Sequence, residues 1–416
     1  MLPLAIWWQR TRLALASAAP RPGIDVPAPA LNAARGALAQ AWFLGRVLAD
    51  AAVEPAARQD ALLARQAAFG ALATAIAGLR TAAPRYAAYA APAVPTADAL
   101  AAPADRVRSF YVLGTNESRA FTASPGVAAL RVDALPGRAA TAELAAEVQK
   151  GLGAGASRAL LARAGGALVP QAPALAGHGL PLEIEADGPL GLFPFPALTV
   201  DGAPLAARRA VRLRLGLAPR AEAPATLGPV AVLGDCAAEC AARDALQGAG
   251  IDAQGPVSPE AAAGRVHLAA RVTAAGLRAG EAPLPTAWLA RADGRLGEVV
   301  VGARAAELTP KDAGARIDAG RRVAAAALQG GAAAVVVPGL PGELAAIALW
   351  RRSQGHRTRV VHHVGAPMTV VREEVGGPAR ALADAVADWQ RFTAAQSTDL
   401  PDGGAAAIAG PVVVVP

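Results

Sequence analysis

The chain has 416 residues, enough for two or three domains, and a formal net charge of +7. Its sequence pI is near 10.3, but the basic residues are dispersed and form no block that would mark a nucleic-acid-binding patch. Hydrophobic residues make up 54% of the chain, much of it alanine, and aromatic residues only 4%. This composition is that of a soluble globular protein and argues against a nucleic-acid partner.

The cysteine content indicates the compartment. Cys236 and Cys240 are too few for a disulfide framework, so we expect a reducing, cytoplasmic location. Leu13 to Ala19 follows two arginines and ends in small residues, a faint signal-peptide pattern that keeps secretion as an alternative. We find no stretch long and apolar enough to span a bilayer and expect no membrane partner.

Residues 1–83 form the first predicted region, which is helical. Between about Leu31 and Arg80 the apolar residues recur at steps of three and four, the period of an amphipathic helix. The pattern breaks near Glu54-Pro55, which predicts two antiparallel helices. The proline- and alanine-rich stretch 84–103 is expected to wrap the surface.

Residues 84–225 predict a small strand unit followed by helices. The predicted strands are Ser109–Leu113, Arg119–Thr122 and Ala129–Val132, and the predicted helices are Thr141–Leu152 and Ser157–Leu168. Gly151, Gly153 and Gly155 have part of the spacing of a dinucleotide-binding loop. Because these glycines follow a helix and not a strand, we interpret them as a linker and expect no cofactor.

Residues 226–416 carry short, continuous apolar runs. Such runs are typical of strands that a parallel sheet buries on both faces. Four of them predict one mostly parallel α/β sheet flanked by helices: Val230–Leu233, Val266–Ala270, Val299–Ala303 and Ala332–Val337. Further predictions are helices over 237–248, 258–264, 317–329, 344–352 and 378–392, a hairpin over 288–295, and strands over 360–364, 370–371 and 408–415.

The segment from Leu182 to Leu198 combines an alternating strand, an Asp187-Gly188 turn and two phenylalanines, Phe193 and Phe195. It resembles a segment of CHAT domains, caspase-like cysteine peptidases of the caspase–separase group. The resemblance covers roughly residues 80 to 416. It implies a caspase-like, mostly parallel sheet flanked by helices, preceded by a small strand unit.

The two catalytic segments of that family also have counterparts here, but both have lost their reactive residue. His267-Leu268-Ala269-Ala270-Arg271 resembles the segment whose last histidine is the base, so Arg271 stands at the base position. Val299 to Arg304 resembles the segment that ends in the nucleophilic cysteine, so Arg304 stands at that position. A guanidinium stays protonated and has no thiolate, so it serves neither role.

The resemblance therefore implies a pseudopeptidase without catalytic activity. Such a protein would bind or regulate a protein or peptide partner, and family members often act in prokaryotic defence or signalling assemblies. Arg271 and Arg304 could hold a carboxylate or phosphate together, or they could turn to solvent.

The main alternative is an active cysteine hydrolase that uses Cys236 as a displaced nucleophile and His267 as its base. The Cys-x-x-x-Cys spacing of Cys236 and Cys240 also permits half of a metal site, but no second pair completes it, and we expect no metal. The simplest interpretation is that both cysteines and His267 pack in the core.

Overall fold

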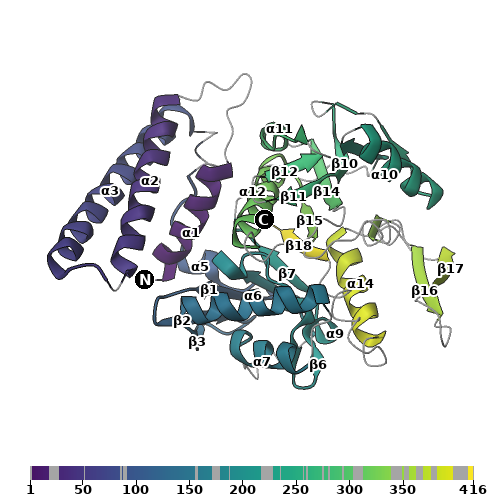
Figure 1. The fold of residues 1–416 in the computed structure, drawn as a ribbon, viewed down its shortest axis with the longest axis horizontal. Coiled ribbons are helices and arrows are strands. Elements are labelled where there is room, and N and C mark those ends of the chain that lie inside the picture. Colours follow the sequence, from purple (N-terminus) through teal and green to yellow (C-terminus); the bar gives the residue numbers. More distant parts are fainter. Residues whose placement is uncertain are drawn as a thin grey trace. The chain divides into compact units, whose positions relative to one another are not determined.

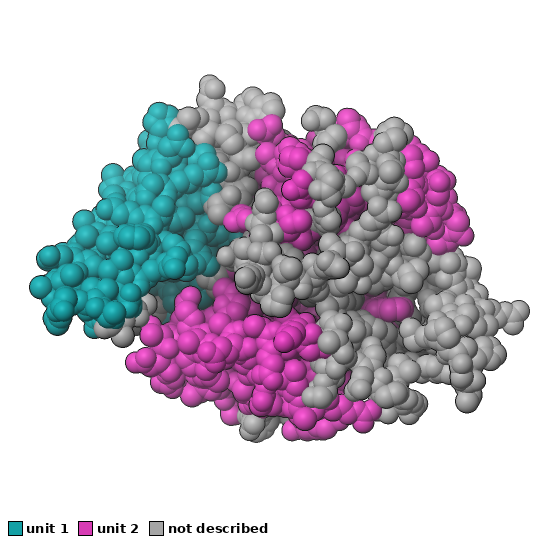
Figure 2. Space-filling model, viewed as in Figure 1, with its two compact units in different colours: residues 1–99 teal, residues 100–416 magenta. Residues whose placement is uncertain are grey.

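The computed structural model describes most of the chain. The described residues are 2–17, 28–50, 52–84, 87, 91–154, 158–170, 179–186, 188–216, 228–234, 236–255, 257–258, 261–273, 276–279, 282–292, 295–302, 313–338, 349–350, 356–361, 369–375, 382–396 and 411–415. The chain divides into two compact units, Met1–Ala99 and Leu100–Pro416 (Figure 2).

Unit 1 is helical, and its three long helices are α1 (Leu2–Ser17), α2 (Ala28–Ala49) and α3 (Pro55–Ala82) (Figure 1). The break between α2 and α3 falls where the sequence predicted it. Pro55 is tolerated at the start of α3. The N–H groups in the first turn of a helix have no acceptor within the helix, so the N–H that proline lacks is not needed there. The core of the unit lies between the helices and includes Leu15, Leu31, Ala34, Leu72, Ile76 and Leu79.

Among the described helices, α3 alone is long and apolar enough to cross a membrane by length and composition. This corrects the expectation that no segment meets those criteria. Between Arg65 and Arg80 this helix has no charged residue, and alanines stand among larger apolar residues such as Leu72, Ile76 and Leu79, which raises its hydropathy. In the structure 22% of the apolar 18-residue stretch of α3 that meets these criteria is buried.

Unit 2 is an α/β structure on a mixed sheet of eleven strands, in the order β3-β2-β1-β4-β7-β18-β15-β14-β10-β8-β9. The strands are β1 (Val107–Val112), β2 (Glu117–Ala123), β3 (Arg131–Pro136), β4 (Leu182–Glu185), β7 (Val211–Arg214), β8 (Val230–Gly234), β9 (Ala253–Gln254), β10 (Gly264–Ala269), β14 (Leu296–Gly302), β15 (Ala334–Pro338) and β18 (Pro411–Val415).

The sheet consists of two parallel halves that run in opposite directions. Strands β9, β8, β10, β14 and β15 are parallel neighbours, which confirms the four strands predicted from apolar runs. Strands β18, β7, β4 and β1 form the second parallel group. The halves meet where β15 pairs with β18 antiparallel, and β2 and β3 extend the far edge antiparallel.

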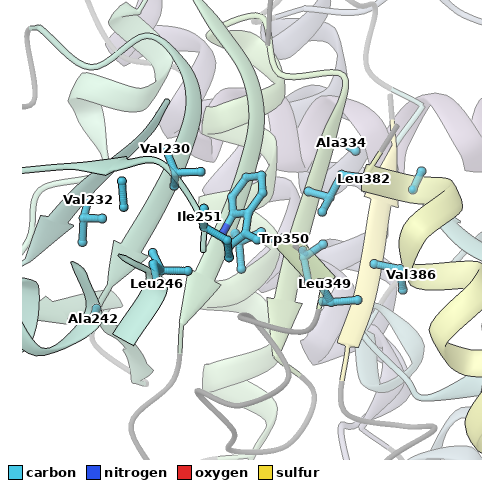
Figure 3. Close-up of a cluster of buried hydrophobic side chains, with 14 residues drawn as sticks. Val230, Val232, Ala242, Leu246, Ile251, Ala334, Leu349, Trp350, Leu382 and Val386 are labelled. Carbon is cyan, nitrogen blue, oxygen red and sulfur yellow. The ribbon is translucent and has the colours of Figure 1, made fainter. Parts of the chain in front are cut away.

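Helices cover both faces of the half that contains β8 to β15. On one face, α10 (Cys236–Gly248) and α14 (Leu382–Gln396) share a hydrophobic cluster with Val336 of β15 (Figure 3). On the opposite face, α12 (Ala313–Gln329) packs so closely that a Cβ on Gly320 would lie 3.4 Å from Val337. The predicted α/β layering is therefore present in this half.

The remaining elements are short or lie beside the sheet. They are α5 (Ala97–Leu100), α6 (Arg138–Ala154), α7 (Arg158–Leu168), η1 (Gly188–Leu190), η2 (Phe195–Ala197), β5 (Thr199–Val200), β6 (Ala203–Pro204), α9 (Leu205–Arg208), β11 (Arg271–Thr273), β12 (Gly276–Ala279), β13 (Ala282–Pro283), α11 (Ala287–Arg291), β16 (His356–Val361) and β17 (Thr369–Val375). Phe193 and Phe195 are fully buried, and their rings pack edge to face.

Three local predictions were wrong. The predicted hairpin over 288–295 contains the helix α11 instead, and an antiparallel sheet of β11, β12 and β13 lies just before it. The described residues of 258–264 form no helix, and β10 begins at Gly264. Gly151 and Gly153 lie inside α6 and are no linker, because flanking alanine and leucine sustain the helix through them.

Candidate functional site

The predicted catalytic segments lie on neighbouring strands. β10 and β14 are parallel, and their last residues, Ala269 and Gly302, are paired. Their carboxyl ends therefore meet at one edge of the sheet, where ligands bind in open α/β sheets. Arg304 lies outside the described residues, so the distance between the two arginine positions stays a prediction.

Arg271 does not end a strand of the main sheet, contrary to its sequence interpretation. β10 ends at Ala269, and Arg271 is the first residue of β11, whose backbone pairs with that of Arg278 in β12. β10 ends one residue before the predicted end at Ala270, and Arg271 to Thr273 pair with β12 in the small antiparallel sheet. The side chain of Arg271 lies outside the described residues.

His267 is a core residue. It is 3% exposed and is paired with Val232 of β8 and Val300 of β14. It therefore lies inside the sheet and not at the carboxyl ends of these strands. The indole N–H of Trp350 donates a hydrogen bond to its Nδ1 at 3.4 Å. Burial lowers the pKa of His267 to about 4, because a charged imidazole has no water around it there.

Gly302 makes room for this imidazole. A Cβ at Gly302 would lie 2.8 Å from Nε2 of His267 and 3.3 Å from a backbone oxygen of β10. A side chain at position 302 would therefore push into His267. The packing supports the interpretation of His267 as a core histidine, neutral at pH 7, over its interpretation as a base at the sheet edge.

The two cysteines are on α10. Cys236 is the first residue of that helix, and its side chain lies outside the described residues, so the pair it could form with His267 stays a prediction. Cys240, one turn later, is a half-buried free thiol. No group of three or more metal-ligating side chains occurs among the described residues.

Beside His267 lies a buried ion pair that the sequence analysis missed. Arg265 of β10 and Glu298 of β14 are opposite each other, 4% and 5% exposed, with 3.4 Å between Nε and Oε2. The other carboxylate oxygen, Oε1, accepts a hydrogen bond of 2.6 Å from the backbone N–H of Leu382. Glu298 therefore caps the start of α14 from the sheet, a task that a residue of the helix itself usually performs.

The environment of Glu298 pulls its pKa in two directions. Burial raises the pKa, while the N–H of Leu382 and the guanidinium of Arg265 oppose that rise. Arg265 also lies over the ring of Trp350, with 5.9 Å between its Cζ and the ring centroid. Arg265, His267, Glu298 and Trp350 thus form one buried polar group, which we call the buried polar cluster, and Trp350 also belongs to the hydrophobic cluster in Figure 3.

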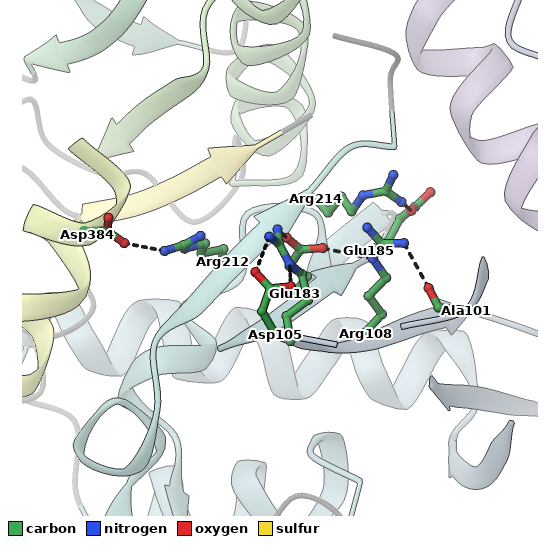
Figure 4. Close-up of polar contacts among 9 residues, drawn as sticks. Ala101, Asp105, Arg108, Glu183, Glu185, Arg212, Arg214 and Asp384 are labelled. Atoms are coloured by element: carbon green, nitrogen blue, oxygen red, sulfur yellow. Dashed lines mark hydrogen bonds and ion pairs between the residues drawn. The ribbon is translucent and has the colours of Figure 1, made fainter. Parts of the chain in front are cut away.

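A second charged network lies on the same face of the sheet, in the other half (Figure 4). Glu183 of β4 accepts hydrogen bonds from Arg106 and Arg108, and Glu185 pairs with Arg214 of β7. We call this network the arginine–glutamate ladder. Arg212, next to it on β7, reaches Asp384 of α14 at 2.6 Å.

The strand register shows that the two networks share a face. Glu298 is paired with Ala334 and belongs to the same face as Val336, which is paired with Val413 of β18. Two steps further across, β18 and β7 place Arg212 on this face, and Glu183 is paired with Arg212. The first turn of α14 contacts this face twice, through Leu382 and Asp384.

The described residues at the carboxyl ends of β8, β10 and β14 present no nucleophile beside a base. The comparisons assign no relatives: no protein-family model matches the chain, and no curated protein matches its sequence.

Proposed function

We propose that the chain is a CHAT-domain-like pseudopeptidase, with a caspase-like fold, that binds a protein or peptide partner and does not cleave it. The observation that supports this proposal most directly is the burial of His267. In the best alternative site this histidine would be the base, yet it is 3% exposed, faces Trp350 and has a pKa of about 4. The parallel pairing of β10 with β14 is also what the resemblance requires.

The partner we propose is an acidic segment of a protein, in a prokaryotic defence or signalling assembly. Support comes from the two arginines that replace the catalytic residues, Arg271 and Arg304. A guanidinium binds a carboxylate through two parallel hydrogen bonds, and such recognition needs no nucleophile.

A binding measurement tests this partner. Fluorescence anisotropy of labelled acidic, neutral and basic peptide pools should show binding of the acidic pool, weakened by salt. The double variant Arg271→Ala with Arg304→Ala should lose that binding, while Arg163→Ala, an exposed arginine of α7, should keep it. Equal binding by the double variant would refute the assigned role of the arginines.

The alternative function is an active hydrolase with Cys236 as nucleophile. It predicts a thiol of depressed pKa that reacts fast with iodoacetamide in the native protein. We expect slow labelling of Cys236, no faster than that of Cys240. Rapid labelling confined to Cys236, with loss of a measured activity, would favour the hydrolase.

A further inference from the structure

The outer edge of β3 is an open strand. β3 is the first strand in the sheet order, and among the described residues no strand pairs with its outer side. Val127, Leu130 and Val132, in and just before this strand, are 57%, 37% and 48% exposed. An open edge with exposed apolar side chains is a template for another strand.

The backbone of β3 has hydrogen-bonding capacity on that side. Pro136 is paired with Glu117 of β2. Proline has no N–H, so it is tolerated where the backbone N–H would point away from β2, toward the open edge. Backbone groups alternate along a strand. Ala134 and Val132 therefore direct their N–H and C=O groups to the open edge.

The sequence along this edge is complementary to itself. It reads Leu130-Arg131-Val132-Asp133-Ala134, with one charge of each sign on either side of a central valine. We propose that a second copy of this chain docks here, β3 against β3, antiparallel about a two-fold axis at Val132. The two copies then share one continuous sheet.

This register accounts for each side chain of the segment. Val132 faces Val132 of the partner subunit, on the sheet face where both are otherwise exposed. Arg131 faces Asp133 of the partner subunit, and the symmetry repeats the pair. Opposite charges directly across two strands stabilise their pairing, and the closing symmetry prevents further growth.

Arg131 and Asp133 have a second interpretation, as a pair that protects the edge strand, and the experiment must distinguish it from pairing between two copies. Within one chain Arg131 donates to Asp133 at 3.1 Å, and charged residues on an edge strand often protect it from pairing. The Arg131 side chain is 44% exposed and Asp133 17%, so in the dimer we expect the arginine to exchange one carboxylate for the other. Since a single strand contact buries little area, the dimer should be weak and depend on concentration.

The experiment is sedimentation equilibrium over the micromolar to millimolar range. The native chain should approach the mass of a dimer. Arg131→Asp and Asp133→Arg should each weaken the dimer about tenfold or more, because two attractions become two repulsions. The combination Arg131→Asp with Asp133→Arg restores opposite charges across the axis and should restore the dimer.

A matched pair on the neighbouring strand provides the control. Glu117 and Arg119 form the same kind of ion pair on β2, which is enclosed between β1 and β3. Arg119→Asp should leave the dimer unchanged. A native chain that stays monomeric, single variants that dimerise like the native chain, or a folded double variant that stays monomeric would each overturn the proposal.

A crosslink tests the position of the axis. In a background with Cys236→Ser and Cys240→Ser, Val132→Cys should form a disulfide-linked dimer on mild oxidation, because residue 132 meets its own copy. Ala134→Cys should not, because its opposite residue is Leu130 of the partner subunit. Equal crosslinking of both variants would contradict this register.

Discussion

The two halves of the sheet differ in how far their ion-paired side chains are buried. In the half from β8 to β15 all of β14 is buried, and the ion pair of Arg265 with Glu298 is buried beside the start of α14 and Trp350. In the half from β1 to β7 the glutamates Glu183 and Glu185 are also buried, but their partners Arg106, Arg108 and Arg214 keep 16% to 31% of their side chains exposed.

This difference shows that a shared sheet face can be closed in two ways. Helices close it over apolar residues, and the buried charges of Arg265 and Glu298 attract each other across 3.4 Å, although the two facing atoms make no hydrogen bond. In the other half arginines lie over the glutamates, since their long side chains cover carboxylates and still reach water. The same ion pair is therefore expected to matter far more in the first half than in the second.

The largest effect should follow from Glu298→Ala. The change removes the cap of α14 and leaves the buried Arg265 without its carboxylate, which should lower the free energy of unfolding by about 3–5 kcal/mol. Urea denaturation measures it. Replacing both partners, Arg265→Met with Glu298→Leu, should recover much of the loss; an equal loss in the double variant would mean that the cap, and not the unpaired charge, dominates.

Acid should weaken the sealed half through His267. The pKa of about 4 in the folded chain lies below the ordinary histidine value of 6.5, so the unfolded chain binds the proton more readily. Stability due to this group is complete above the unfolded pKa and is lost as pH falls toward the folded one, by about 2 kcal/mol between pH 7 and pH 5.

The control for this pH effect is His267→Leu. Glu298, whose pKa is raised by burial, and the neighbouring Arg265 are present in both proteins, so the difference between the two pH profiles isolates the histidine. The native chain should lose more stability on acidification than the variant. Parallel profiles would show that His267 is not buried in its neutral form.

Gly302→Ala should have a smaller effect in the same half. The new methyl would lie 2.8 Å from the imidazole of His267, and such overpacking should cost about 1–3 kcal/mol of unfolding free energy. Gly166→Ala on α7 is the matched control, because nothing lies within 4 Å of its Cβ. It should leave stability unchanged or raise it; equal losses would argue against the close contact at Gly302.

The smallest effect should come from the arginine–glutamate ladder. Glu183→Gln removes the carboxylate that Arg106 and Arg108 share, but both arginines can rehydrate, so the loss should be about 1 kcal/mol and should shrink with salt. Thermal unfolding at low and high salt measures it. A loss as large as that of Glu298→Ala would erase the contrast between the two halves.

Much of the fold was predictable because the strands differ in pattern. The runs in β8, β10, β14 and β15 are continuous, which is the mark of burial on both faces, and the structure confirms those strands. The ladder could have been found as well. Leu182-Glu183-Ile184-Glu185 and Val211-Arg212-Leu213-Arg214 alternate with opposite charges, which predicts two paired strands with a charged face.

The candidate site was less predictable, since its geometry depends on distant residues. Nothing local marks Glu298 as the cap of a helix that starts at Leu382, or Trp350 as the partner of His267. The place of Arg271 was also wrong, because the chain leaves the main sheet after Ala269 and Arg271 begins a strand of a different sheet. Apolar patterns indicate that a strand exists, but they do not show which sheet it joins.

Cleavage of a broad peptide library tests the central claim most directly. The native chain and the variant Cys236→Ser with Cys240→Ser are incubated with the same library, and new termini are counted by mass spectrometry. A non-catalytic protein predicts no new termini above the blank in either sample. Cleavage by the native chain that disappears in the variant would contradict the account in favour of Cys236, and cleavage that survives would reveal a nucleophile elsewhere.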